Sequence, residues 1–118
     1  MYKILITDDA AFMRTMLKGI LQNEGYQFIE AVNGMEMLEK VKTERPDLIT
    51  LDITMPVMDG LEALKELKRR GDKTPVIMCS AMGQQAMVID AIQHGAIDFI
   101  VKPFKPDKIL DSVRKALH

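Results

Sequence analysis

The stretch Leu48-Ile49-Thr50-Leu51 is a short, mostly apolar run that leads directly into the carboxylate of Asp52. Two other runs also end in charged residues: Ile4-Leu5-Ile6-Thr7 before Asp8-Asp9, and Phe99-Ile100-Val101 before Lys102-Pro103. Near-continuous apolar runs of this length are typical of strands that are buried on both faces of a parallel sheet. If the three runs are neighbouring parallel strands, their carboxyl ends lie together at one edge of a sheet.

The whole sequence alternates between such runs and segments with helical periodicity. We predict five strands, near residues 3–7, 26–29, 48–51, 75–79 and 97–101. Each is followed by apolar residues at helical spacing. This alternation predicts an α/β fold, a doubly wound five-stranded parallel sheet with five helices on its two faces. One common strand order for such a sheet is 2-1-3-4-5, which places the first and third strands side by side.

Length and composition exclude several classes of protein. The 118 residues suit one domain, and we predict a single domain over 1–118. A formal net charge of −1 provides no basic field for nucleic acid or for an anionic membrane. No apolar run approaches the roughly 20 residues that span a bilayer, and the early first strand leaves no space for a signal peptide. The lone Cys79 excludes an intrachain disulfide and is expected to be a small buried side chain. We predict a cytoplasmic protein.

Charged residues are expected to converge at the carboxyl edge of this sheet. With the order 2-1-3-4-5, Asp8, Asp9 and Asp52 share the point where the winding reverses. Clustered carboxylates favour a hard divalent cation such as Mg²⁺, and a cation together with Lys102 favours a transferable phosphoryl group. An aspartate that follows a strand can also cap the next helix. The chemical interpretation therefore depends on these side chains lying together.

Further motifs occur in order along the alternating pattern: Met55-Pro56, Asp59-Gly60, Ser80-Ala81 and Lys102-Pro103-Phe104. With the aspartates, they make the chain resemble, over essentially its whole length, the receiver domain of two-component response regulators, which has a flavodoxin-like fold. Residues 8–14, 52–56 and 79–85 resemble the stand-alone chemotaxis members most. Residues 24–27 and 44–47 are also similar to single-domain phosphorelay intermediates of sporulation.

The resemblance implies a role for each residue of the predicted site. Asp52 is implied as the phosphoacceptor, whose carboxylate attacks phosphorus to form an acyl phosphate. Asp9, Asp52 and the backbone carbonyl of Thr54 are implied as direct Mg²⁺ ligands, with Asp8 acting largely through water. Lys102 is expected to pair with Asp52 or Asp9 at rest and with a phosphoryl oxygen afterwards.

The resemblance also implies a switch that reports phosphorylation. The Ser80 hydroxyl is expected to follow the phosphoryl group, although it could equally cap the next helix. Phe99 occupies the aromatic switch position, where many chemotaxis members carry Tyr or Trp, and the alternative is a plain core residue. The family holds the peptide equivalent to Lys102-Pro103 in the cis form.

Taken together, these features predict a phosphoacceptor, not an enzyme, that assists its own phosphorylation and dephosphorylation. A histidine kinase is the expected donor, and the flagellar motor switch protein is the expected target. The target would bind the face formed by the helix around residues 88–92, the strand 97–101 and the last helix. The alternative is a phosphorelay intermediate that passes the group to a histidine of a phosphotransfer protein. A flavin-binding electron carrier is disfavoured, because Asp8-Asp9 stand where a phosphate-binding loop would be needed.

Two residues bear on how long the acyl phosphate lasts. Thr54 and Met82 are implied to flank the path by which water reaches the phosphorus. Neither side chain can orient a water molecule as an amide or a carboxylate could. We therefore expect a persistent acyl phosphate and a separate phosphatase as a further partner.

Overall fold

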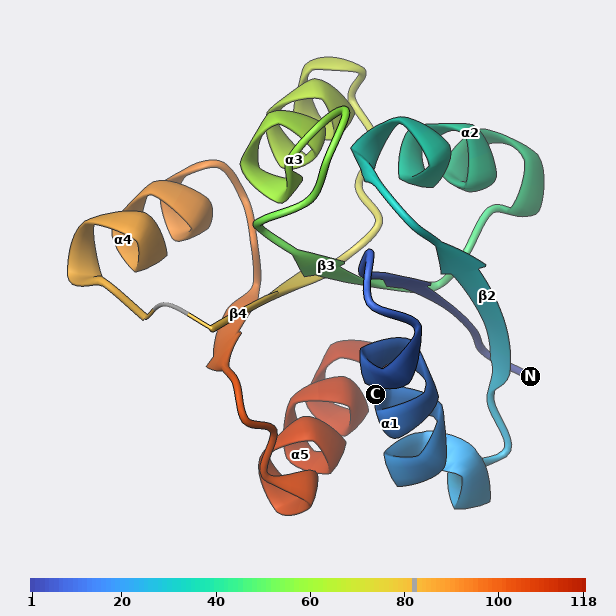
Figure 1. Cartoon of the computed structure of the whole chain (residues 1–118). Coiled ribbons are helices and arrows are strands. Elements are labelled where there is room, and N and C mark those ends of the chain that lie inside the picture. Colours follow the sequence, from blue (N-terminus) through green and yellow to red (C-terminus); the bar gives the residue numbers. More distant parts are fainter. Residues whose placement is uncertain (82) are drawn as a thin grey trace.

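A computed structural model describes residues 1–81 and 83–118 of the chain. In these residues five strands alternate with five α-helices, as predicted, and one short 3-10 helix follows the first helix (Figure 1). The elements are β1 (Lys3–Thr7), α1 (Ala11–Leu21), η1 (Gln22–Glu24), β2 (Gln27–Ala31), α2 (Gly34–Glu44), β3 (Leu48–Asp52), α3 (Gly60–Arg69), β4 (Val76–Ser80), α4 (Gln85–Gln93), β5 (Asp98–Val101) and α5 (Pro106–Leu117). No helix among these is both long and apolar enough to span a membrane.

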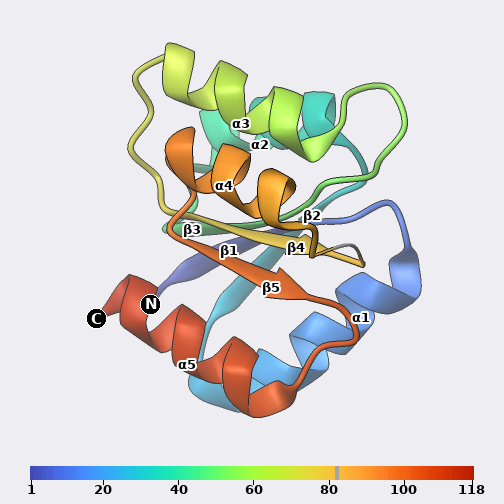
Figure 2. The ribbon, with the colours of Figure 1, turned by 90° about the vertical axis from the view of Figure 1, so that its left-hand side faces the viewer.

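The strands form one parallel sheet in the order β2-β1-β3-β4-β5, which confirms the predicted order. Helices α2, α3 and α4 cover one face of the sheet, and α1 and α5 cover the other (Figures 1 and 2). In the register of β1 with β3, Ile4 lies opposite Leu48 and Thr7 lies opposite Leu51. The two strands therefore end level with each other, and the residues that follow them meet at the same edge.

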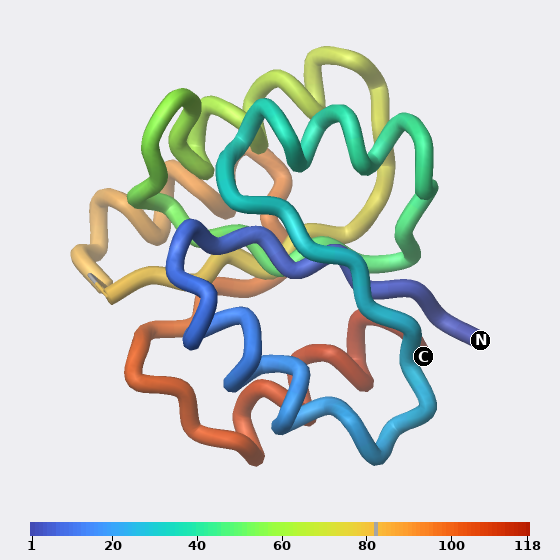
Figure 3. Tube along the Cα trace, turned by 45° about the vertical axis from the view of Figure 1, so that its right-hand side comes forward, coloured from blue at the N-terminus to red at the C-terminus, as the bar shows by residue number. Residues whose placement is uncertain are grey.

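The core consists of two apolar layers, one on each face of the sheet. Leu5 and Ile49 point to the layer under α2, α3 and α4, whereas Ile4, Ile6 and Leu48 point to the layer under α1 and α5. This division follows from the alternation of side chains along a strand. At the end of the sheet away from the acidic residues, the rings of Tyr2 and His118 lie edge to face with centroids 5.3 Å apart. The two ends of the chain accordingly lie next to each other (Figure 3).

The predicted strand limits are close to the observed ones, with a shift at β2. That strand was expected over 26–29 and runs instead over Gln27–Ala31. The reason is that its backbone pairing with β1 continues through Glu30 and Ala31, which lie opposite Ile6 and Thr7. Main-chain pairing with β1 sets where this strand ends, and the polar side chain of Glu30 does not end it earlier.

The junction between β3 and α3 controls the position of Asp52. Asp59 is the N-cap of α3 and forms a capping box with Glu62, so Asp52 does not cap this helix, which was the alternative role for it. The Gly60 N–H donates to the Ile53 carbonyl oxygen at 2.8 Å. A Cβ atom at Gly60 would lie 2.9 Å from the Ile53 Cα and nearer still to the Asp52 carbonyl oxygen. Only glycine permits this close approach of the helix to the end of β3.

We expect the substitution Gly60→Ala to lower the free energy of unfolding by about 1–3 kcal/mol, because the added methyl group must push the backbone of Asp52 and Ile53 aside. Chemical denaturation of the two proteins measures this difference. Gly19→Ala is the matched control, because Gly19 is an exposed position in α1 with nothing within 4 Å of its added Cβ. This control should gain about 0.5–1 kcal/mol from better helix propensity. Equal stabilities of the two variants would contradict the close-approach argument.

Candidate functional site

The structure brings the three predicted aspartates together at the carboxyl edge of the sheet. Asp8 and Asp9 follow the end of β1, and Asp52 is the last residue of β3. One carboxylate oxygen of each residue lies within 4.8 Å of the oxygens of the other two. Three negative groups at this separation form a set of hard oxygen ligands that suits Mg²⁺, which commonly takes one or two carboxylates and keeps several waters.

Lys102 places its ammonium group beside two of these carboxylates. Its Nζ lies 2.8 Å from Asp8 Oδ2 and 3.4 Å from Asp52 Oδ1. The expected pairing with Asp52 is therefore present, but the shorter contact is with Asp8, which was not predicted as a partner. The Lys102 N–H donates to the Ser80 carbonyl oxygen at 2.8 Å, which holds the lysine against the end of β4. The peptide between Lys102 and Pro103 is cis.

Asp8 is held by its backbone as well as by its side chain. Its N–H donates to the Ala31 carbonyl oxygen at 3.1 Å, and its Oδ1 accepts from the Ala10 N–H at 2.9 Å. The N-cap of α1 is Ala10 itself, which has no side-chain cap. Neither Asp8 nor Asp9 is thus the N-cap of this helix, although Asp8 does satisfy one N–H group at its start.

Burial sets the electrostatics of the site. Asp8 and Asp52 are only 2% and 6% exposed, whereas Asp9 is exposed. Burial raises the pKa of Asp52; the charge of Lys102 opposes this effect and the negative charge of Asp8 adds to it. Burial acts to lower the pKa of Lys102, but its hydrogen bond to Asp8 and the charge of Asp52 outweigh that effect and raise it. The lysine therefore stays protonated.

The raised pKa of Asp52 has a consequence for stability. A group whose pKa is higher in the folded than in the unfolded chain stabilises the fold below the unfolded pKa, and this stabilisation is lost as the pH rises through the folded pKa. At neutral pH the ionised Asp52 is therefore a destabilising group. A divalent cation among the carboxylates would offset the repulsion between Asp52 and Asp8.

The predicted switch residues lie around this edge. Ser80 is the last residue of β4 and is buried, whereas Thr54 is exposed two residues beyond Asp52. Phe99 lies on β5, half-buried against the core layer under α2, α3 and α4. Gln84 is the N-cap of α4, so the alternative role of Ser80 as the cap of that helix is wrong. Met82, the second residue expected to flank the water path, lies outside the described residues.

Cys79 takes no part in this chemistry. Its side chain is 2% exposed and packs in the layer under α1 and α5, as the sequence indicated. Burial raises the pKa of its thiol to about 12, so it remains protonated and is no nucleophile.

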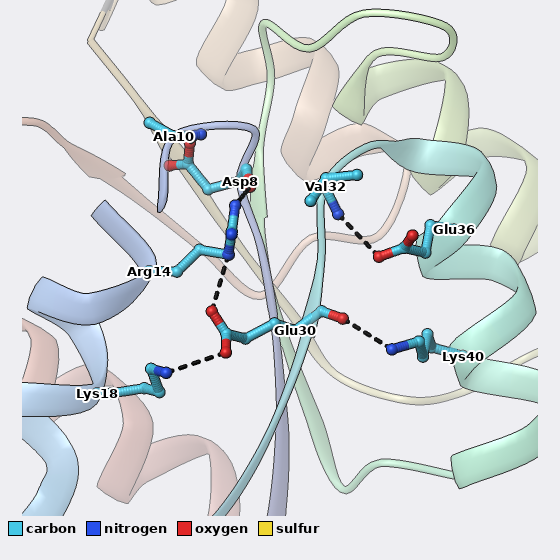
Figure 4. Close-up of polar contacts among 8 residues, drawn as sticks. All are labelled: Asp8, Ala10, Arg14, Lys18, Glu30, Val32, Glu36 and Lys40. Carbon is cyan, nitrogen blue, oxygen red and sulfur yellow. Dashed lines mark hydrogen bonds and ion pairs between the residues drawn. The ribbon is translucent and has the colours of Figure 1, made fainter. Parts of the chain in front are cut away.

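The sequence did not indicate two residues that support the site. The guanidinium of Arg14 on α1 donates to the Asp8 carbonyl oxygen and to the Glu30 carboxylate on β2 (Figure 4). Arg14 and Glu30 are 16 residues apart, and the fold brings them together by placing α1 beside β2. No local motif could have revealed this contact.

Comparison with known proteins agrees with this geometry. The family model of the response regulator receiver domain matches residues 4–114. The chain is 58% identical to the chemotaxis protein CheY of Bacillus subtilis, over 99% of this chain and 98% of that protein. It is 42% identical to the sporulation initiation phosphotransferase F of the same species, over 98% of this chain and 93% of that protein.

The fold comparison leads to the same family. A chain of the crystal structure of the CheX–CheY–BeF3–Mg²⁺ complex from Borrelia burgdorferi is similar to this chain with a TM-score of 0.93 and 38% identity. That similarity covers 99% of this chain and 90% of the other. The family match extends from β1 into α5 and includes every element that carries the acidic residues and the lysine. The chain therefore belongs to the family of response regulator receiver domains.

Proposed function

We propose that this chain is a chemotaxis response regulator that accepts a phosphoryl group from a histidine kinase on Asp52, with Mg²⁺ bound by Asp8, Asp9, Asp52 and the Thr54 carbonyl. Its similarity to CheY proteins over nearly their full length supports the chemotaxis assignment. One observation carries the chemistry. Three carboxylates with oxygens within 4.8 Å of one another adjoin an ammonium group that already contacts two of them.

The proposed transfer follows from these groups. A carboxylate oxygen of Asp52 attacks the phosphorus of a phosphohistidine on the kinase. The new O–P bond forms as the P–N bond breaks, and the imidazole keeps the electron pair and takes up a proton. Mg²⁺, when bound, neutralises charge on the phosphoryl oxygens. Lys102 supplies a second positive charge, and its position between Asp8 and Asp52 leaves it close to the incoming group.

We propose that phosphorylation is read out by Lys102, Ser80 and Phe99. Lys102 would exchange Asp8 for a phosphoryl oxygen, the Ser80 hydroxyl would donate to another, and the Phe99 ring would move inward. The hydrogen bond from the Lys102 backbone N–H to the Ser80 carbonyl oxygen links two of these residues directly. Phe99 also lines a hollow together with Val101, Lys105 and Lys108, so its movement would reshape the surface there.

The proposed output surface is the face formed by α4, β5 and α5, which lie side by side in Figure 2. It carries accessible apolar side chains: Ile89, Ile92 and Val101 are 46%, 45% and 46% exposed. Exposed apolar groups beside basic residues suit a protein partner. We propose the flagellar motor switch protein as that partner. A dedicated phosphatase is a further proposed partner, because the exposed Thr54 is too short to orient a hydrolytic water.

The phosphorelay alternative rests on the similarity to sporulation initiation phosphotransferase F, which is lower than that to CheY. The relay and chemotaxis functions differ in the protein that the activated chain engages, so a binding experiment can separate them. Beryllofluoride, which mimics the phosphoryl group on Asp52, should raise the affinity of the chain for purified motor switch protein, as measured by calorimetry. A phosphotransfer protein serves as the comparison. Rapid passage of the phosphoryl group to its histidine, without activation-dependent binding to the motor protein, would favour the relay.

Asp52→Asn should abolish phosphorylation by the organism's purified histidine kinases, because an amide oxygen is too weak a nucleophile to form the acyl phosphate. Intact-protein mass spectrometry detects the added group. The variant should be at least as stable as the wild type near neutral pH, since a buried ionised carboxylate is removed. Asp111→Asn, at an exposed position in α5, is the control and should be phosphorylated normally. Continued phosphorylation of Asp52→Asn would exclude this residue as the acceptor.

Lys102→Arg should separate phosphorylation from its output. The planar guanidinium keeps the charge, but it cannot occupy the position of an ammonium group between Asp8 and Asp52. We expect the variant to be phosphorylated while the ratio of target affinities with and without beryllofluoride falls towards unity. Lys42→Arg, at an exposed position in α2 outside the proposed output surface, should keep the wild-type ratio. An unchanged ratio in Lys102→Arg would refute the switch role of this lysine.

A further inference from the structure

Arg14 connects the acidic loop to the neighbouring strand. Its Nη1 donates to the Asp8 carbonyl oxygen at 2.7 Å, and its Nε donates to Glu30 Oε1 at 2.8 Å. Figure 4 shows the guanidinium between these two partners. The Arg14 side chain is only 14% exposed, whereas that of Glu30 is 37% exposed, so the arginine is the better shielded partner of this ion pair.

Glu30 is a firm anchor for this arginine. Its second carboxylate oxygen accepts from Lys18 Nζ at 2.9 Å, and its backbone carbonyl accepts from Lys40 Nζ at 3.1 Å. The residue is therefore tied to α1 on one side and to α2 on the other (Figure 4). The hydrogen bonds from Lys18 and Arg14 lower the pKa of Glu30, which keeps it ionised.

The carbonyl that Arg14 holds has a particular place in the chain. It belongs to the peptide unit that joins Asp8 to Asp9, so fixing its oxygen fixes the plane of that peptide. The orientation of this plane constrains ψ of Asp8 and φ of Asp9, and it thereby limits the directions in which their side chains leave the backbone. Mg²⁺ demands near-ideal octahedral geometry, and small errors in ligand direction therefore weaken its binding.

We propose that Arg14 is a positioning residue that holds the Asp8–Asp9 peptide against Glu30 and thereby orients the acidic residues for a divalent cation. The inference rests on the proposed metal site. It assigns Arg14 no contact with the metal or with the phosphoryl group.

The charge of Arg14 and its positioning role have opposite effects on metal affinity. A nearby positive charge repels Mg²⁺, so the loss of that charge alone would strengthen metal binding. The loss of the bridge to Asp8 would weaken it. The sign of the change in affinity therefore distinguishes the two effects.

The experiment is calorimetric titration of Mg²⁺ into the wild type, Arg14→Met and Arg14→Lys. Methionine keeps the packing of the stem but removes both hydrogen bonds. Lysine keeps the charge, but its single ammonium lacks the forked geometry that serves Asp8 and Glu30 together. We expect Mg²⁺ binding to be about 10-fold weaker in both variants, the usual size of an effect from a residue that orients a metal ligand.

Two controls accompany these variants. Lys18→Met removes the other ion pair of Glu30 but leaves the Asp8 carbonyl contact in place, so it should bind Mg²⁺ like the wild type. Asp9→Asn removes a proposed ligand and should bind more weakly. Circular dichroism of each variant shows that it is folded, and Arg14→Lys carries the test if Arg14→Met is not.

The outcomes are distinct. Wild-type or tighter Mg²⁺ binding by folded Arg14→Met and Arg14→Lys would overturn the positioning role while leaving the metal site intact. Equal weakening by Lys18→Met would also overturn it, because the loss of affinity would then not depend on the hydrogen bond from Arg14 to the Asp8 carbonyl. A wild-type chain that binds no Mg²⁺ would instead remove the proposed metal site, and this inference with it.

Discussion

The position of the Lys102 ammonium between two buried carboxylates is the interaction on which the resting site depends. Asp8 and Asp52 are almost inaccessible to water, and ionised groups in such surroundings are tolerated only when they are paired. The lysine follows β5, so its side chain reaches over the ends of β4 and β3 towards β1. The ion pair thus joins strands that are not neighbours in the sheet. Its removal would leave two like charges buried together, which is strongly unfavourable.

The rest of the structure serves to hold the backbone beneath these side chains. Asp8 is fixed through Ala31 on β2, and Lys102 is fixed through Ser80 on β4. The close approach of Gly60 brings the start of α3 against the end of β3, immediately below Asp52. At least one neighbouring element therefore constrains the backbone at each of Asp8, Asp52 and Lys102. Preorganisation of this kind lets a site bind a metal and a phosphoryl group without first reorganising.

Much of this arrangement could be predicted from the sequence, because it follows from periodicity and strand order. Apolar runs located the strands, and parallel pairing then placed Asp9 and Asp52 at one edge. The contact of Lys102 with Asp8 could not be predicted, because it depends on the side-chain path across β3 and β4. The Arg14 bridge to Glu30 escaped prediction for a related reason, since it depends on how α1 lies beside β2. The capping box at the start of α3, in contrast, could be recognised from the sequence alone, because Asp59 and Glu62 have the spacing that defines it.

The burial of the central ion pair also separates the site from its ionic surroundings. Side-chain exposure is 15% for Lys102 and 3% for Asp8, whereas Arg69 and Arg70, which pair with Glu66 on the surface, are 72% and 46% exposed. The screening length in 0.1 M salt is about 10 Å, and salt weakens interactions between exposed charges more than those between buried ones. A change in ionic strength should therefore weaken the exposed pairs around Glu66 more than the contact of Lys102 with Asp8. The resting geometry around Lys102 is thereby decoupled from the salt concentration of its surroundings more than the surface of α3 is.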